Sequence, residues 1–213
     1  GAIPIIKPFD HHPGSEPVPQ DEEFRSDDCL WFFNAIPAYV LESGDVDFYR
    51  KVLPFAEKGE ATVLGHLRRA LEFNLERSGA HGLPCGLSAD WNDCLRLGYF
   101  GESLFVAFQV RLGLTVYAGI SKLLDLPAEE EWALSEREKL DLSIQTVGWD
   151  GEWFIWAIGE NGEIYGSRSQ AEGQVYLNTQ VWSVISGAAS PVQAKSSLQT
   201  VYERLHTPYG LIL

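Results

Sequence analysis

Two carboxylates, an indole and a carboxamide lie side by side in the run Asp90-Trp91-Asn92-Asp93. An indole can pack against the apolar face of a sugar ring, while amide and carboxylate oxygens bind its hydroxyl groups. A carboxyl group in a partly dry site has a raised pKa and can donate a proton to a glycosidic oxygen. These residue types therefore predict a carbohydrate site with an acid catalyst. The same four residues could also form a surface turn, so the motif alone leaves a structural alternative open.

The residues around the motif predict a loop between two helices. Turn residues flank it, with Gly82-Leu83-Pro84 before and Gly98-Tyr99-Phe100-Gly101 after. Apolar residues at helical spacing predict one helix over about 61–77 and another from Glu102 or Ser103 to about 124. The two carboxylates are therefore expected where connecting segments usually carry function.

The remaining pattern predicts a mainly α fold. Further helices are expected over about 26–43, ending at Gly44, and over about 128–147, 179–187 and 191–206. The first is apolar nearly all the way round, which predicts a buried inner helix. Asn161-Gly162 between two apolar runs predicts a small β-hairpin. Successive helices joined by functional loops favour a helical toroid, and six or seven helices can be counted.

Residues 1–25 differ from the rest of the chain and are treated as a separate segment. Five prolines in this stretch predict an irregular, Pro-rich lead-in that packs on the domain formed by residues 26–213. The adjacent His11 and His12 lack a third ligand at a suitable spacing, so no metal site is predicted.

Composition excludes several classes of protein. The chain has 16 Lys and Arg against 30 Asp and Glu, a net charge of -14, so neither nucleic acid nor an anionic membrane is an expected partner. No apolar run approaches the roughly 20 residues that span a bilayer, and residues 1–7 lack the plan of a signal peptide. The three cysteines have no CxxC spacing and suit reduced thiols. A cytoplasmic enzyme is predicted.

Four blocks of sequence, in order, resemble one family. The loop from His81 to Ser103 resembles the catalytic loop of the inverting disaccharide phosphorylases, family 94 of the glycoside hydrolases. Ser26-Asp27-Asp28-Cys29-Leu30-Trp31 is similar to the family's Ser-Asp-Asp-x-Leu-Trp. Residues 149–154 are similar to its Trp-Asp-Gly-x-Trp-Phe, and residues 178–182 to its Asn-Pro-Gln-x-Trp. Together the blocks cover roughly residues 24–213.

The resemblance implies a specific fold and reaction. Family members place their active site in an (α/α)6 barrel of twelve helices, so residues 26–213 are expected to form the first half of such a barrel. Asp93 matches the general acid, which protonates the leaving oxygen while inorganic phosphate attacks the anomeric carbon. The implied reaction is phosphorolysis of a β-linked glucose disaccharide, cellobiose-like, to α-glucose 1-phosphate. Phosphate is a co-substrate, and no cofactor is expected.

The resemblance also distributes roles among other residues. Trp91 is expected to shape the donor subsite, and one acid of Asp27 and Asp28 to bind the donor sugar. Gln180 lies on a matching block and is a further candidate for substrate binding, as is Arg25, which lies one residue away from the position of the family's arginine. Asp90 and Asn92 are instead expected to order the loop, because four consecutive side chains cannot all face one ligand. Trp149, Trp153 and Trp182 are expected in the core.

Two alternatives remain open. A β-glucosidase would use water in place of phosphate and would need a second carboxylate across the pocket from Asp93. A non-catalytic sugar-binding fragment is the other alternative, because the family's phosphate-binding histidine and threonine-glycine pair are expected beyond the end of this chain. A half barrel would expose the apolar inner faces of its helices, so a homodimer, or docking with the rest of the catalytic domain, is expected.

Overall fold

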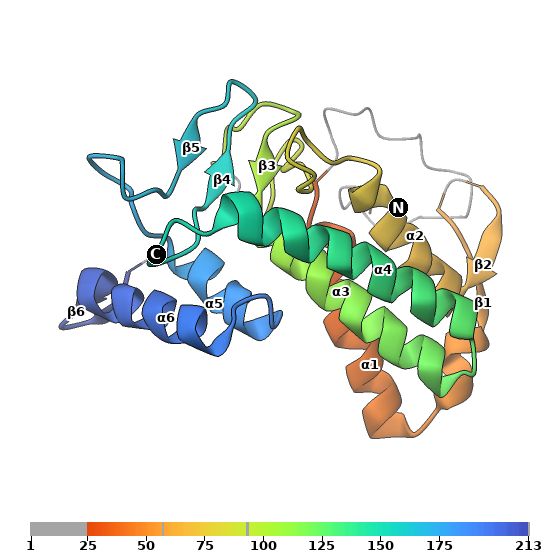
Figure 1. Cartoon of the computed structure of the whole chain (residues 1–213). Coiled ribbons are helices and arrows are strands. Elements are labelled where there is room, and N and C mark those ends of the chain that lie inside the picture. The colour runs from red at the N-terminus through yellow and green to blue at the C-terminus, as the bar shows by residue number, and fades with distance from the viewer. Residues whose placement is uncertain (1–24, 57, 93, 213) are drawn as a thin grey trace.

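A computed structural model describes residues 25–56, 58–92 and 94–212. The Pro-rich lead-in, with His11 and His12, lies outside the described residues apart from Arg25. The architecture is mainly helical with small antiparallel sheets. Its centre is helix α3 (Leu104–Leu123), and α4 (Pro127–Ser143) runs back alongside it (Figure 1). By length and composition α3 could cross a membrane, but 72% of its apolar window is buried, as in a core helix.

Two further helices pack against α3. Helix α2 (Val63–Leu75) begins at Thr62, whose hydroxyl accepts a hydrogen bond from the Gly65 amide at 3.0 Å. Helix α1 (Phe32–Ser43) follows a 3-10 turn, η2 (Asp28–Trp31), and ends at the left-handed Gly44 as expected. Between α1 and α2 lie the 3-10 turn η3 (Val46–Arg50) and the short strands β1 (Val52–Pro54) and β2 (Glu60–Thr62).

The prediction that the first helix is buried all round is wrong for the described chain. Within α1, Phe33 and Val40 are buried, whereas Phe32, Tyr39 and Leu41 are exposed, Leu41 at 83%. The physical reason is that α1 packs on α3 and on the turn before it, and these contacts cover one side of the helix. The other apolar side faces outward.

A small sheet lies at the N-terminal end of α3. The predicted hairpin is confirmed as β4 (Ala157–Ile158) and β5 (Ile164–Tyr165), with Gly162 at a positive φ in the turn. The sequence did not predict its third strand, β3 (Glu102–Ser103), which pairs with β4 through Glu102 opposite Ile158. The start of α3 is therefore fixed by strand pairing as well as by helix packing.

The C-terminal part is a helix pair that polar contacts fasten to the core. Helix α5 (Leu177–Ile185) leads to α6 (Pro191–Leu205), which begins with a capping box of Ser190 and Gln193. The π-helical turn η4 (Ile144–Gly148) follows α4, and the hairpin β6 (His206–Thr207) and β7 (Gly210–Leu211) follows α6.

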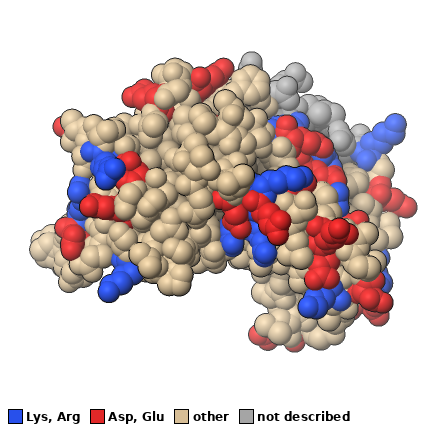
Figure 2. Space-filling view, in the orientation of Figure 1, with Lys and Arg blue, Asp and Glu red and all other residues tan. Residues whose placement is uncertain are grey.

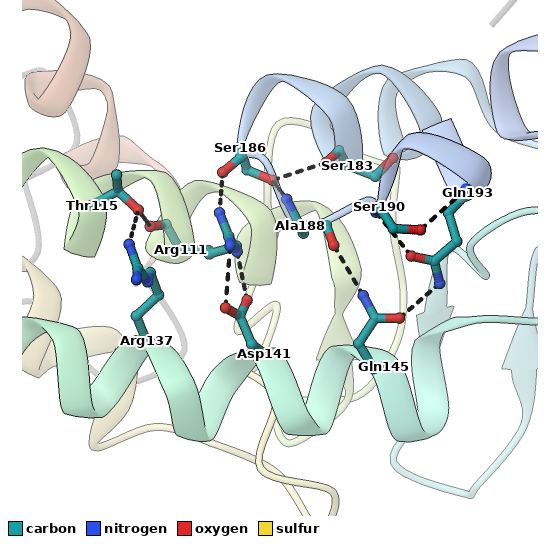
Figure 3. A network of polar contacts seen from close by, with 10 residues as sticks. All are labelled: Arg111, Thr115, Arg137, Asp141, Gln145, Ser183, Ser186, Ala188, Ser190 and Gln193. Carbon is teal, nitrogen blue, oxygen red and sulfur yellow. Dashed lines mark hydrogen bonds and ion pairs between the residues drawn. The ribbon is translucent and has the colours of Figure 1, made fainter. Parts of the chain in front are cut away.

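Figure 3 shows the contacts that hold the connection between α5 and α6. Arg111 of α3 donates to both oxygens of Asp141 on α4, at 2.5 and 3.1 Å, and also to the Ser186 carbonyl. Gln145 donates to the Ala188 carbonyl at 2.9 Å and accepts from Gln193 at 2.7 Å. One planar guanidinium thus links three helices through charge-assisted hydrogen bonds.

Two glycines of α3 provide a matched test of this packing. A Cβ on Gly113 would lie 2.9 Å from Leu71 and 3.1 Å from Phe33, whereas a Cβ on Gly119 would meet nothing within 4 Å. We expect Gly119→Ala to stabilise the protein by about 0.5–1 kcal/mol through helix propensity. Because Gly113→Ala adds overpacking to that gain, it should be about 1–3 kcal/mol less stable than Gly119→Ala. Chemical denaturation measures both, and equal stabilities would contradict the packing described.

Candidate functional site

The loop between α2 and α3 is closed at its base by backbone hydrogen bonds. The Gly86 amide donates to the Gly101 carbonyl at 2.8 Å, and the Ser103 amide donates to the Pro84 carbonyl at 3.0 Å. Leu83, Cys85 and further leucines of the loop are buried. The Asp-Trp-Asn-Asp motif therefore lies on an ordered loop whose two ends meet, as the turn residues around it predict.

Asp90 is the internal anchor of this loop. It is fully buried, and its carboxylate accepts from the Ser103 hydroxyl at 2.7 Å and from the Asn92 amide at 2.8 Å. Burial raises its pKa, while these two hydrogen bonds act in the opposite direction. Through these contacts the Asp90 carboxylate joins the middle of the loop to the residue at its end, Ser103, which is the arrangement expected of a residue that orders the loop. Its side chain does not reach the surface.

Asn92 continues the same chain of turns. Its side-chain oxygen accepts from the Cys94 amide at 3.0 Å, and its carbonyl accepts from the Leu95 amide at 3.0 Å. Each side chain thus fixes the backbone two residues further along, as in an Asx turn. Asp93, the predicted acid, lies outside the described residues.

The acidic segment near the start of the described chain packs on this loop. Ser26 donates from its amide to the Ala89 carbonyl at 3.2 Å and from its hydroxyl to the Gly86 carbonyl at 3.1 Å. The Arg25 backbone forms bridges with Leu87 and Ala89. The structure therefore brings Arg25 and the Asp27-Asp28 pair beside the motif, although more than 50 residues separate them in sequence.

Asp27 and Asp28 differ in environment. Asp27 is only 4% exposed and accepts a hydrogen bond from the indole nitrogen of Trp31 at 2.9 Å, whereas Asp28 is partly exposed. Burial raises the pKa of Asp27 to about 6; the negative charges of Asp28 and Asp90 add to the rise, and the Trp31 hydrogen bond opposes it. Two buried carboxyl groups, Asp27 and Asp90, thus lie close enough to interact.

An aromatic pocket of about 290 Å³ opens beside the motif. Its two exposed indoles are Trp91 (49%) and Trp31 (41%). Trp182 meets both Trp31 and Phe105 edge to face, with ring centroids 5.6 and 5.5 Å apart. The lining consists of aromatic and aliphatic side chains and one amide: Trp31, Trp91, Phe105, Leu177, Asn178, Val181 and Trp182.

Gln180 does not line this pocket. It is fully buried, its side-chain oxygen accepts from the Phe154 amide at 2.9 Å, and its side-chain nitrogen donates to the Phe154 carbonyl at 2.7 Å. Because the side-chain oxygen and nitrogen of Gln180 both bond to the backbone of Phe154, this side chain holds α5 against the segment before β4. Its predicted role in sugar binding remains a prediction.

The three tryptophans expected in the core have different surroundings. Trp153 is fully buried and donates to the Gly166 carbonyl at 2.9 Å, while Trp149 is partly buried against Phe154. Trp182 is also partly buried, and one side of it faces the pocket. Asp150, next to Trp149, accepts from the Ser167 hydroxyl and the Arg168 amide, both at 2.8 Å, and so orders the loop after β5.

Sequence reasoning missed several residues of the site. Trp31, Phe105 and Asn178 line the pocket but were not predicted to do so. A signal existed for two of them, because Trp31 and Asn178 belong to the blocks that resemble the family. Phe105 gave no such signal, because its spacing fits an ordinary core position of α3.

The arrangement suits sugar chemistry. Aromatic faces can hold a pyranose ring, and the buried carboxyl groups show that this part of the protein raises the pKa of an acid by removing it from water. Among the described residues, no group of three or more His, Cys, Asp or Glu side chains could hold a metal ion. An aromatic pocket beside an acidic loop on a helical framework is the arrangement expected of a carbohydrate site.

Comparison with known proteins gives the family. The model of the glycosyl hydrolase 94 superfamily catalytic domain matches residues 11–213, and the chain belongs to this family. The matching family model describes a catalytic domain, and the two Vibrio relatives described below are named as phosphorylases.

Similar proteins include two phosphorylases and a rhamnosidase. The N,N'-diacetylchitobiose phosphorylases of Vibrio proteolyticus and Vibrio furnissii are 38% and 36% identical, and each match covers 92% of this chain and 26% of the relative. The chain therefore spans about a quarter of the length of these relatives. A GH78 family rhamnosidase of Bacillus sp. GL1 shares the fold, with a TM-score of 0.67 at 15% identity over 88% of this chain and 18% of that one.

The raised pKa of Asp27 predicts a pH dependence of stability. Burial raises the pKa in the folded state, so between about pH 4 and pH 6 the folded protein binds more protons than the unfolded chain. Stability should then fall as pH rises through this window. Asp27→Asn removes this effect. The free energy of unfolding of the variant, relative to that of wild type, should therefore rise by up to about 3 kcal/mol between pH 4 and pH 6.

Urea denaturation across this pH range measures the difference between wild type and variant. Asp47→Asn serves as the control, because the side chain of Asp47 is 87% exposed. Parallel curves for wild type and Asp27→Asn would show that the Asp27 carboxyl is not desolvated as described.

Proposed function

We propose that this chain carries the acid-bearing part of an inverting disaccharide phosphorylase, with Asp93 as the general acid. The observation that carries the proposal is the ordered loop around Asp93. Asp90 fixes this loop from within, and Trp91 lies on it at the edge of an aromatic pocket. The family relationship supports the reaction class.

In the proposed mechanism, Asp93 protonates the glycosidic oxygen as the bond to the anomeric carbon breaks. Inorganic phosphate attacks from the opposite face, so the product is an α-sugar 1-phosphate. Phosphate is itself a competent nucleophile, and no base is needed to activate it. Trp31 and Trp91 would hold the sugar ring, and Asp28, the more exposed acid of its pair, would bind a donor hydroxyl.

Other groups must counter the repulsion between phosphate and the acids. Asp27 lies beside the loop and Asp90 within it, and their negative charges oppose the approach of a dianion. Arg25, whose backbone bridges the loop, is a candidate to bind phosphate. Further phosphate-binding groups would come from regions that correspond to the parts of the relatives not matched by this chain. In this proposal the described helices form part of a helical toroid, and the reaction needs no cofactor.

The sugar at the donor subsite is proposed to be glucose or N-acetylglucosamine. Cellobiose fits the resemblance of the catalytic loop, while the two Vibrio relatives are named for N,N'-diacetylchitobiose. The apolar lining of the pocket favours a sugar with an acetamido methyl group. A cytoplasmic location is proposed because Cys29, Cys85 and Cys94 are all free thiols.

The experiment uses the intact protein encoded by the gene, incubated with phosphate and either cellobiose or N,N'-diacetylchitobiose. We expect phosphate-dependent release of an α-sugar 1-phosphate, detected by phosphorus NMR. Asp93→Asn should lower turnover at least about a hundredfold, because it removes the proton donor but preserves volume. Asp90→Asn should lose less activity, mainly through disorder of the loop.

Circular dichroism and melting curves check that both variants are folded. Hydrolysis independent of phosphate would assign the protein to the glycosidases, and sugar binding without turnover would indicate a binding protein. Greater damage from Asp90→Asn than from Asp93→Asn would show that the two roles are assigned the wrong way round.

We further propose that the 213-residue chain by itself forms a dimer or a larger assembly. Large apolar side chains are exposed on α1 and on the α5–α6 pair, with Leu41 at 83%, Ile185 at 53% and Tyr202 at 60%. In Figure 2 acidic and basic side chains gather over α4, and charged side chains also lie over α6, whose sequence includes Lys195, Glu203 and Arg204. Exposed apolar patches of this kind mark interaction surfaces. A second copy would bring the six described α-helices to twelve.

Light scattering of the purified 213-residue chain tests this proposal. We expect at least twice the 23.8 kDa of one chain, and Leu41→Lys should shift the mass toward the monomer because it places a charge in the contact. Leu142→Lys is the control, since Leu142 is a 70% exposed leucine on α4. A monomeric wild type would overturn the proposal, as would equal effects of the two substitutions.

A further inference from the structure

We propose that Glu102 is a positioning residue for the proposed general acid, acting through the backbone at the start of the catalytic loop. The inference rests on the proposed function, because it assigns to Glu102 the placement of the loop that carries Asp93. Glu102 belongs to the two-residue strand β3 and is 2% exposed, so its carboxylate is removed from water.

Three donors converge on this buried carboxylate, all from the start of the loop. Its Oε1 atom accepts from the His81 amide at 2.9 Å and from the Leu83 amide at 3.1 Å. Its Oε2 atom accepts from Nδ1 of His81 at 2.6 Å. A buried carboxylate requires such donors, because an unpaired charge in the interior is strongly destabilising. The loop therefore wraps around Glu102.

The contact between loop and carboxylate is also close sterically. A Cβ placed on Gly79 would lie 2.4 Å from Cγ of Glu102, so only glycine allows the backbone to approach this side chain. The Gly79 amide in turn donates to the Leu83 carbonyl at 2.9 Å. Residues 79–83 thus form a tight turn built on one carboxylate.

Strand β3 holds the loop at a second point. Ser103, the neighbour of Glu102, donates to Asp90 at 2.7 Å, and both residues of β3 pair with β4. One rigid strand therefore fixes the entry to the loop through Glu102 and its middle through Ser103. The segment from Trp91 to Cys94 begins directly after the second point. In this proposal, a shift of residues 79–83 is passed on to the rest of the loop through β3, because Glu102 and Ser103 are adjacent on this strand.

The chemical consequence concerns protonation of the leaving group. A displacement of about 1 Å at a reacting group can lower a rate by about a hundredfold. Loss of position at Asp93 should slow substrates whose leaving group needs a proton, such as a disaccharide. An aryl glycoside with a 4-nitrophenolate leaving group needs no proton and should be little affected.

The test compares Glu102→Gln with wild type in the intact protein. The carboxamide oxygen can still accept from the two backbone amides, but these bonds are no longer charge-assisted, and the atom that faces His81 Nδ1 becomes an N–H donor; the turn at 79–83 is therefore held less firmly while the side-chain volume is kept. We expect kcat for the disaccharide to fall about tenfold to a hundredfold, with KM nearly unchanged. With the 4-nitrophenyl glycoside of the same donor sugar, kcat should change less than about threefold.

Two control variants complete the design. Glu163→Gln makes the same chemical change at an exposed carboxylate in the β4–β5 turn and should leave both substrates unaffected. His81→Ala removes the ring donor but leaves both backbone donors, so its loss should be smaller than that of Glu102→Gln. If Glu102→Gln does not fold, Glu102→Asp replaces it, because its carboxylate lies one methylene further from the turn at 79–83. This variant should also lower kcat for the disaccharide much more than kcat for the 4-nitrophenyl glycoside.

Equal slowing of both substrates would indicate general damage to the protein and would overturn the inference. Unchanged rates with both substrates would overturn it as well. Hydrogen exchange separates this inference from the proposed function. Glu102→Gln should speed amide exchange in the peptide 85–95 while α4 stays protected, whether or not the wild type cleaves a disaccharide. Unchanged exchange there would contradict the positioning role even in an active phosphorylase.

Discussion

The hydroxyl group of Ser103 joins the helical core to the loop that carries the site. It accepts from the Val106 amide at 3.3 Å and so caps α3, and it donates to the buried carboxylate of Asp90 at 2.7 Å. The same residue pairs with β4. One residue thus fixes the start of the central helix and the centre of the loop between α2 and α3 through its side chain, and joins the sheet through its backbone. The remaining features of the site are placed relative to this point.

Buried acids are the second organising feature. Asp27 and Asp90 come from distant segments and are brought together because Ser26 hydrogen-bonds to the loop backbone. Each is desolvated, and each is partly compensated by a donor: the Trp31 indole for Asp27, and the Ser103 hydroxyl for Asp90. The environment that raises these pKa values is also the kind that keeps a catalytic acid protonated near neutral pH. Asp27, through Trp31, also contributes to the wall of the aromatic pocket.

Much of the helical framework could be predicted because it depends on local interactions. Thr62, Ser103 and Ser190 cap α2, α3 and α6 close to the predicted starts, and Gly44 ends α1. Capping requires only residues within one turn of each other, so the sequence shows it directly. Strand β3 could not be predicted, since two residues carry no periodic signal and their partner lies more than 50 positions away.

The sequence by itself determined the residue types of the site, the loop between α2 and α3 and the carbohydrate chemistry that these imply. Tertiary structure decided which groups are buried. It placed Asp90 in the interior and Trp91 at the surface, paired Gln180 with the backbone of Phe154, and left one apolar face of α1 uncovered. The physical reason is that burial and desolvation arise from contacts between segments distant in the chain. A local pattern records what a residue can do, while its surroundings decide whether its charge, donor or ring is available to a ligand.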